Sequence, residues 1–108
     1  MKNLLTNPIR NITLEERAAK LNEKDRSGKD FTPARREVVK EQNKVKNGGT
    51  MKCENCGVET PNAQKSKKGV TPPKNEAHVD HVKRKREGGR GNPDNGQVLC
   101  GGCNVEKH

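Results

Sequence analysis

Aromatic residues are nearly absent from this sequence, which has one Phe and no Tyr or Trp among its 108 residues. Aromatic side chains usually contribute much of the apolar area that a domain buries. Hydrophobic residues make up 26% of the chain. Adding the 11 glycines raises this share to roughly 36%, against roughly 45–50% in ordinary globular domains. The hydrophobic core must therefore be small, and we expect a second source of stability.

Long apolar runs are missing as well. No segment approaches the roughly 18 consecutive apolar residues that span a bilayer, and residues 1–10 lack the apolar stretch of a secretory signal. We therefore expect a soluble chain that carries no export signal of its own. Low hydrophobicity combined with high charge also permits disorder, which stays open as an alternative for the first dozen residues.

Charge of one sign is in excess. The chain has 23 Lys and Arg against 14 Asp and Glu, which gives a net charge of +9. This excess favours a polyanion such as nucleic acid as the partner, although an acidic protein would fit too. Because aromatic side chains for stacking on bases are lacking, sequence-specific recognition of single strands is disfavoured.

The first half of the chain, residues 1–49, is predicted to be a helical region or linker. Thr13-Leu14-Glu15-Glu16 has the form of a capping box and predicts a helix from about Leu14 to Arg26. Thr32-Pro33 predicts the start of a second helix that continues to about Lys46. The apolar residues of this second helix form only a thin stripe, so the helix needs a surface to lie against; they are Ala34, Val38, Val39 and Val45.

The cysteines carry the strongest structural signal. Two Cys-x-x-Cys pairs, Cys53 with Cys56 and Cys100 with Cys103, have the spacing of two knuckles that bind one tetrahedral Zn²⁺. The alternative is two disulfides in a secreted protein, which the missing signal peptide disfavours. A structural zinc can contribute roughly 10 kcal/mol or more of folding free energy, so it would supply the expected second source of stability. A four-cysteine site has no open coordination position and indicates nothing about catalysis.

Between the two pairs, residues 76–82 alternate as a strand does and include Asp80 and His81. Asp80 is a hard oxygen ligand for a divalent cation, and His81 carries an imidazole, the side chain most often used as a general base. Together they suit phosphodiester hydrolysis. Neighbours on a strand point to opposite faces, so the two can serve one reaction only if the strand is twisted or bulged at its end. His78, on the face of Asp80, is a further ligand, a partner of a ligand or a surface residue.

These residues belong to a longer pattern that resembles the HNH endonuclease family, over about residues 51–108. The matching positions are Val79-Asp80-His81-Val82, Gly88-Gly89, Asn95, Val98-Leu99-Cys100 and Cys103-Asn104-Val105-Glu106-Lys107. The resemblance implies an α+β fold, in which a small ββα-metal nuclease domain at residues 50–108 is held by the four-cysteine zinc site and preceded by the helical region. It further implies that His81 is the general base, that Asn95 braces the loop carrying this base, and that Asp80 is a metal ligand.

One position departs from the family pattern. Many members have a metal-binding His where this chain has Asn104, so the chain resembles the HNN variant. An Asn carbonyl oxygen is a harder ligand than imidazole and suits Mg²⁺ or Mn²⁺, while Ni²⁺ and Zn²⁺ stay open as the catalytic ion. His108 lies at i+4 from Asn104, on the same helical face, where colicin-type members carry a further metal-binding His. Its alternative is a solvent-exposed terminal residue.

The reaction that the resemblance implies is a one-metal hydrolysis of DNA. His81 takes a proton from water, the resulting hydroxide attacks phosphorus in line, and the products carry 5′-phosphate and 3′-hydroxyl ends. A basic run follows the strand and is predicted to contact phosphates beside the scissile bond. No element for reading bases is evident, so we expect cleavage of duplex DNA with little sequence preference. The predicted phosphate-contacting residues are Lys83, Arg84, Lys85, Arg86 and Arg90.

Three stretches, residues 48–60, 69–77 and 91–100, resemble the C-terminal toxin domains of bacterial polymorphic toxins, including contact-dependent inhibition and Rhs-type effectors. This resemblance implies a domain that is delivered into a competitor's cytoplasm as the C-terminal part of a larger secreted protein. It also implies an immunity protein, expected to be acidic, in the producing cell. Two alternatives stay open: a free-standing HNH nuclease of a phage or mobile element, and a zinc module that binds DNA without cleaving it.

Overall fold

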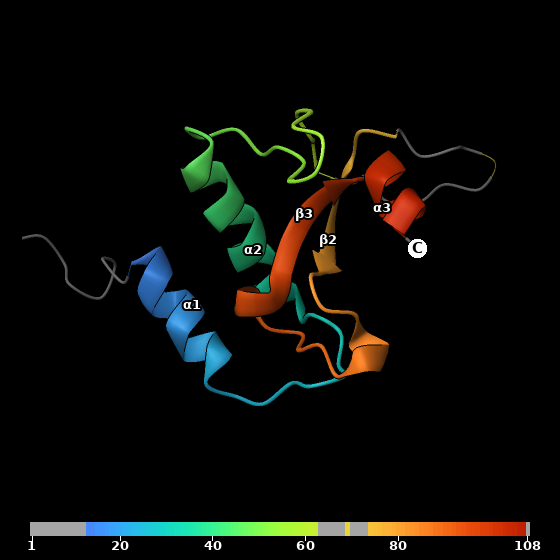
Figure 1. Cartoon of the computed structure of the whole chain (residues 1–108). Helices are drawn as coiled ribbons and strands as arrows, with labels where there is room; N and C mark the ends of the chain where they lie inside the picture. Colours follow the sequence, from blue (N-terminus) through green and yellow to red (C-terminus); the bar gives the residue numbers. More distant parts are fainter. Residues whose placement is uncertain (1–12, 63–68, 70–73, 108) are drawn as a thin grey trace, which may run out of the picture.

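The computed structural model describes residues 13–62, 69 and 74–107. Two helices come first, followed by a strand hairpin and a last helix (Figure 1), and this arrangement confirms the predicted α+β class. No helix within the described ranges is both long and apolar enough to span a membrane. The elements are α1 (Leu14–Asn22), α2 (Pro33–Lys46), β2 (Ala77–His81), η2 (Lys85–Glu87), η3 (Pro93–Asn95), β3 (Gly96–Cys100) and α3 (Gly101–Lys107).

Both N-terminal helices begin at the predicted caps. The hydroxyl of Thr13 accepts a hydrogen bond from the Glu16 amide at 3.1 Å, and the Glu16 carboxylate accepts one from the Thr13 amide at 3.2 Å, which is a complete capping box. At α2 the hydroxyl of Thr32 accepts a hydrogen bond from the Arg35 amide at 3.3 Å, without the reciprocal bond. The predicted end of the first helix at Arg26 is wrong, because α1 ends at Asn22. The residues that follow leave the helical path to form hydrogen bonds with the C-terminal half.

The sheet consists of β2 and β3, which pair antiparallel without a bulge. His78 lies opposite Leu99, Asp80 opposite Gln97, and His81 opposite Gly96. Helix α2 packs mainly on β3, and α3 contacts both strands. In Figure 1 the two helices lie on different sides of the hairpin. The hairpin therefore presents one face to α2 and its surroundings and another to α3.

The core is small and is shared between the N-terminal region and the hairpin. Its buried members are Phe31, Val39, Met51, Ala77 and Val98, with Val79 packed against them. A Cβ on Gly96 would lie 2.5 Å from Val39 Cγ2, so the close approach of α2 to β3 requires glycine there. The division into residues 1–49 and 50–108 stays a prediction about domains. Within the described ranges, residues on both sides of it pack into this one core.

The apolar stripe of α2 is narrower than predicted. Val38 and Val39 are buried, but Ala34 is exposed and 69% of Val45 is accessible to solvent. Polar residues complete the buried face of the helix instead, namely Arg35 and Asn43. Ala34 and Val45 therefore add nothing to the buried face of α2, and hydrogen-bonding side chains occupy it where the apolar pattern is sparse.

The side chains of both buried polar residues form hydrogen bonds. Arg35 Nε donates to Asn92 Oδ1 at 3.1 Å, and Arg35 Nη2 donates to the Leu21 carbonyl at 3.2 Å. The Asn43 side chain donates to the Lys52 carbonyl at 2.8 Å and accepts from the Lys52 amide at 2.7 Å. Buried polar groups contribute to stability only when they are paired in this way. Hydrogen bonds thus attach α2 to the rest of the molecule where apolar side chains are few.

Candidate functional site

The structure brings the four cysteines together at one end of the hairpin. Their sulfur atoms all lie within 4.8 Å of one another, and the Sγ atoms of Cys56 and Cys100 are 3.8 Å apart. A tetrahedral zinc with Zn–S bonds of about 2.3 Å places its sulfurs about 3.8 Å apart. One pair lies in the turn that follows Met51, and the other lies at the junction of β3 and α3. The cluster therefore fits a metal ion such as zinc in both donor chemistry and spacing.

Backbone amides donate hydrogen bonds to the sulfurs of Cys53 and Cys100. The amides of Asn55 and Cys56 donate to Cys53 Sγ, and the amide of Cys103 donates to Cys100 Sγ, all at 3.4 Å. Burial raises the pKa of the Cys53 thiol, but hydrogen bonds from Cys56, Cys100 and Asn55 outweigh it and lower this pKa to about 6. A shared cation is the natural means of keeping neighbouring thiolates ionised.

Cys103 is the opposite case within the same cluster. The Asn55 side chain donates to Cys103 Sγ at 3.2 Å and lowers the pKa of this thiol, but the neighbouring cysteine sulfurs raise it to about 12. The Cys103 thiol therefore resists ionisation beside the other cysteine sulfurs unless a cation is bound. The contact from Asn55 was missed by the sequence analysis, and its signal was a side-chain amide inside the first knuckle.

Asp80 lies on the face of the hairpin that α3 covers. Its side chain is buried, and Lys107 Nζ on α3 lies 2.6 Å from Asp80 Oδ2. Gln97 Nε2 donates to the same oxygen at 3.3 Å, and Lys107 also donates to the His81 carbonyl. A buried carboxylate needs such partners to offset the loss of water. The sequence pattern included Lys107 but did not predict this ion pair, which ties the end of α3 to the end of β2.

His81 lies on the other face, towards the N-terminal region. Its Nε2 lies 2.9 Å from the Lys29 carbonyl oxygen, and its ring centroid lies 4.4 Å from that of Phe31 at an interplanar angle of 40°. Because the strand pairs regularly as far as His81, Asp80 and His81 face opposite sides of it. Their joint action in one reaction stays a prediction.

Asn95 ties together the two ends of the loop that joins β2 to β3. Its Oδ1 accepts from the Lys83 amide at 2.8 Å, while its Nδ2 donates to the Lys83 carbonyl at 3.1 Å and to the Arg90 carbonyl at 2.9 Å. The Asn95 carbonyl accepts from the Val82 amide at 2.9 Å. These four bonds fix the segment directly after His81. The geometry is that of a brace, the role that the resemblance implies for Asn95.

A second metal ion would be held from the face of Asp80. Asn104 is half-buried on α3, three positions before Lys107, whereas His108 lies outside the described residues. A carboxylate and an amide oxygen suit Mg²⁺ or Mn²⁺, so the donor chemistry fits. A cation on Asp80 would compete with the ammonium of Lys107. In the described ranges the four cysteines form the only cluster of at least three His, Cys, Asp or Glu residues placed to hold an ion.

His78 has a defined partner. Its Nε2 lies 3.2 Å from an oxygen of the buried Glu76 carboxylate, and 40% of the His78 side chain is exposed. The structure thus adds a contact between His78 and a carboxylate directly before β2, while the three roles considered for His78 stay predictions.

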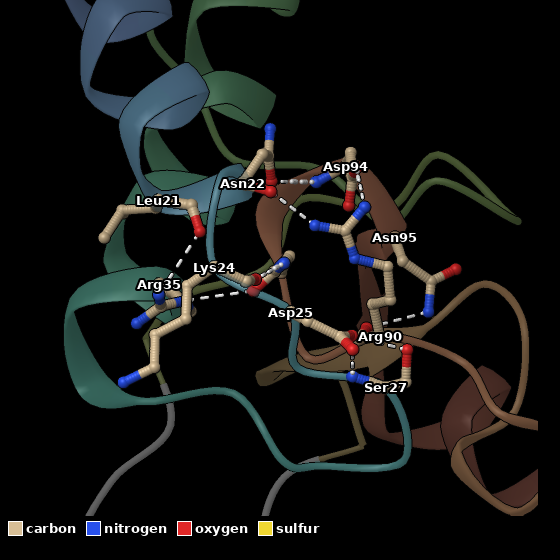
Figure 2. Close-up of polar contacts among 10 residues, drawn as sticks. Leu21, Asn22, Lys24, Asp25, Ser27, Arg35, Arg90, Asp94 and Asn95 are labelled. Carbon is tan, nitrogen blue, oxygen red and sulfur yellow. Dashed lines mark hydrogen bonds and ion pairs between the residues drawn. The ribbon is translucent and has the colours of Figure 1, made fainter.

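The predicted phosphate-contacting residues fall into two groups. Lys83, Lys85 and Arg86 are exposed after β2, and Lys85 pairs with Asp30 at 2.9 Å. The other two hold parts of the fold together. The guanidinium of Arg84 donates to the Lys107 carbonyl, and that of Arg90 bonds to the Asn22 carbonyl and to Asp94, as Figure 2 shows for Arg90.

Comparison with known proteins adds one finding. A family model described as HNH endonuclease matches residues 53–108 of this chain. The matched span contains the four cysteines, both strands of the hairpin and α3. Neither the curated proteins nor the solved structures include a match.

Proposed function

This chain belongs to the HNH endonuclease family, and we propose that it is a metal-dependent endonuclease that hydrolyses duplex DNA with little sequence preference. The observation that carries the proposal is the position of His81. Its imidazole is half-exposed at the last position of β2, directly before a loop that Asn95 braces at both ends. The net charge of +9 supports a nucleic acid as the substrate.

In the proposed reaction each residue has a limited task. His81 accepts a proton from the attacking water, and Asn95 keeps the following segment in place. Asp80 and Asn104 would hold the divalent ion, with His108 as a further candidate ligand. When bound, this ion supplies stabilisation of the negative charge that develops on the phosphate and on the leaving 3′-oxygen. Asp80 and His81 are the last residues of β2, and we propose that both contact a phosphate bound at this strand end.

The four-cysteine site has a separate, structural task. We propose that its ion is zinc, which joins the turn after Met51 to the start of α3. This link fixes the end of the hairpin opposite to His81. The exposed residues Lys83, Lys85 and Arg86 are proposed to contact phosphates, while Arg84 and Arg90 contribute through the contacts that hold the fold.

The test is cleavage by the purified, zinc-loaded chain. Supercoiled plasmid and RNA are incubated with it in the presence of Mg²⁺, Mn²⁺, Ni²⁺ or added Zn²⁺, beside the His81→Ala and Asp80→Ala variants. We expect metal-dependent nicking of the plasmid by the wild type only. Asp80→Ala should weaken binding of the added ion while the tightly bound zinc remains. DNA binding without cleavage under every condition would favour the non-catalytic zinc module. Faster cleavage of RNA than of plasmid would show that RNA, not DNA, is the preferred substrate.

We further propose that the nuclease is the toxic effector domain of an interbacterial competition toxin. The similarity of residues 48–60, 69–77 and 91–100 to polymorphic toxin domains supports this role. A nuclease that does not read sequence also endangers its own cell, so it needs an inhibitor. An acidic immunity protein could use the basic residues after β2 as its binding surface, because charge complementarity speeds capture. Delivery would be as the C-terminal part of a larger secreted protein, with action in the recipient's cytoplasm.

Expression in bacterial cytoplasm tests this role. We expect DNA degradation and growth arrest with the wild type, no arrest with His81→Ala, and rescue by a small protein encoded immediately downstream. Tolerated expression of a protein that is active in vitro, with no effect of the neighbouring gene, would favour a free-standing phage or mobile-element nuclease.

A further inference from the structure

The loop between α1 and α2, residues 23–32, runs along the loop that joins β2 to β3. The Gly28 amide donates to the Gly89 carbonyl at 2.9 Å, and the Gly91 amide donates to the Arg26 carbonyl at 3.0 Å. These are main-chain contacts between segments that lie far apart in the sequence. They place the N-terminal loop beside the segment that follows His81.

Side chains strengthen this attachment at both ends of the loop. Asn92, which is fully buried, donates to the Lys24 carbonyl at 2.8 Å, and Lys85 pairs with Asp30 at 2.9 Å. Figure 2 shows the neighbouring contacts that Arg90 and Asp94 make with Asn22. The backbone at residues 29–31 is therefore held from the C-terminal half of the molecule.

This backbone contacts the imidazole of His81 directly. The Lys29 carbonyl oxygen lies 2.9 Å from His81 Nε2. A carbonyl oxygen can only accept a hydrogen bond, so Nε2 must carry the hydrogen. A neutral imidazole has a single N–H, so the lone pair is then on Nδ1. The ring of the buried Phe31 lies against the imidazole and restricts its rotation.

We propose that residues 29–31 are a positioning element for His81. The Lys29 carbonyl selects the tautomer with hydrogen on Nε2, which makes Nδ1 the nitrogen that accepts the proton, and the Phe31 ring holds the plane of the imidazole. This inference rests on the proposed function, in which His81 is the general base. It extends the working site beyond residues 53–108, the span that the family model matches.

The structure offers a way to move the carbonyl without altering His81 or its strand. A Cβ on Gly91 would collide with the carbonyl oxygens of Lys29 and Asp30, so Gly91→Ala must displace this backbone. Phe31→Leu removes the ring but keeps an apolar side chain in the core. Lys29→Ala is the matched control, because it removes only an exposed side chain and leaves the carbonyl in place.

The experiment measures the nitrogen-15 chemical shifts of the histidine rings in the full, zinc-loaded chain, at a pH where the imidazole is neutral. The His81 signals are assigned with a His81→Asn variant. We expect hydrogen on Nε2 in the wild type and in Lys29→Ala, and a mixture of tautomers in Gly91→Ala and Phe31→Leu. For plasmid cleavage we expect kcat to fall about 10-fold or more in these two variants, with KM changed by no more than about twofold.

Hydrogen on Nδ1 of wild-type His81 would overturn the proposal. So would wild-type tautomer and kcat in both Gly91→Ala and Phe31→Leu. If Gly91→Ala loses its zinc or its cooperative unfolding, Phe31→Leu decides alone. If the wild type cleaves no nucleic acid, the proposed function fails, and the tautomer still tests the positioning: hydrogen on Nε2 that becomes mixed in the variants supports it, and unchanged shifts contradict it.

Discussion

The two ends of the hairpin are built in different ways. At the four-cysteine end, each pair of ligands spans one short turn, and amides of the same turn donate to Cys53 and Cys100. At the other end, His81 contacts residues 29 and 31, and Asp80 pairs with Lys107 on α3 and accepts from Gln97 on β3. Each knuckle of the four-cysteine end, here called the metal end, is thus specified locally, whereas the His81 end, here called the base end, depends on tertiary packing throughout. Mutations should therefore act differently at the two ends.

The largest effect is expected at the metal end. Cys100→Ser would remove one of the four sulfurs that we propose hold zinc. A structural zinc site of this kind contributes roughly 10 kcal/mol, a value similar to the whole stability of a typical domain. We expect loss of bound zinc and of cooperative thermal unfolding, and the same result when the wild type is treated with a strong chelator. Elemental analysis and calorimetry measure both.

Val58→Ala is the control, because Val58 is 42% exposed beside the first knuckle and is not a ligand. It should keep zinc and unfold near the wild-type temperature. A wild-type protein that contains no zinc, or two disulfides in protein prepared under reducing conditions, would contradict the metal assignment. The difference between the two ends could then not be attributed to metal binding.

At the base end we expect loss of activity with the fold retained. His81→Ala should lower the cleavage rate roughly 10²–10⁴-fold, since the general base acts in the transition state, while zinc content and DNA affinity stay close to wild type. His78→Gln is the matched control on the same strand, because this half-exposed side chain can still hydrogen-bond to Glu76. Cleavage by His81→Ala at most of the wild-type rate would contradict the assignment of His81 as base.

The same contrast explains how far the sequence could predict the structure. The caps at Thr13 and Thr32 and the clustering of the cysteines were predicted correctly, because their signals lie within a few residues. The end of α1 was not predicted, since Asn22 is held by Arg90 and Asp94 from the C-terminal half. No local pattern can indicate such contacts.

The candidate site shows this limit most clearly. Sequence reasoning named Asp80, His81 and Asn95, and the requirement that adjacent strand residues face apart came from strand geometry alone. What it could not supply were the partners, namely the Lys29 carbonyl, the Phe31 ring and the Lys107 ammonium. A carbonyl carries no sequence signal, because every residue has one. Likewise, the sequence pattern of α2 gave no indication that Arg35 is buried.

A third prediction concerns this buried arginine, which connects α2 to the region of the base. Arg35→Met leaves the oxygen of Asn92, a fully buried residue, without its guanidinium donor, and such a loss costs about 1–3 kcal/mol for each group left unpaired. We expect a fall of about 5–15 °C in Tm by calorimetry, with zinc still bound. Arg17→Met is the control, because the Arg17–Glu41 pair is largely exposed and worth little. Equal shifts in both variants would show that burial of Arg35 does not matter.

The smallest effect is expected from the exposed basic residues after β2. Lys83→Ala removes one proposed phosphate contact, so the slope of log K for DNA binding against log salt concentration should fall by about one, with Tm and zinc content unchanged. Lys20→Ala, on the exposed side of α1, removes the same charge elsewhere and should leave the slope nearly unchanged.

Arg84→Ala should differ from both. Its guanidinium donates to the Lys107 carbonyl, so this variant should lower Tm as well. Filter-binding titrations between low and moderate salt measure the slope. If Lys20→Ala reduced it as much as Lys83→Ala, the DNA would be attracted by net charge alone, and the base end would have no phosphate-binding surface of its own.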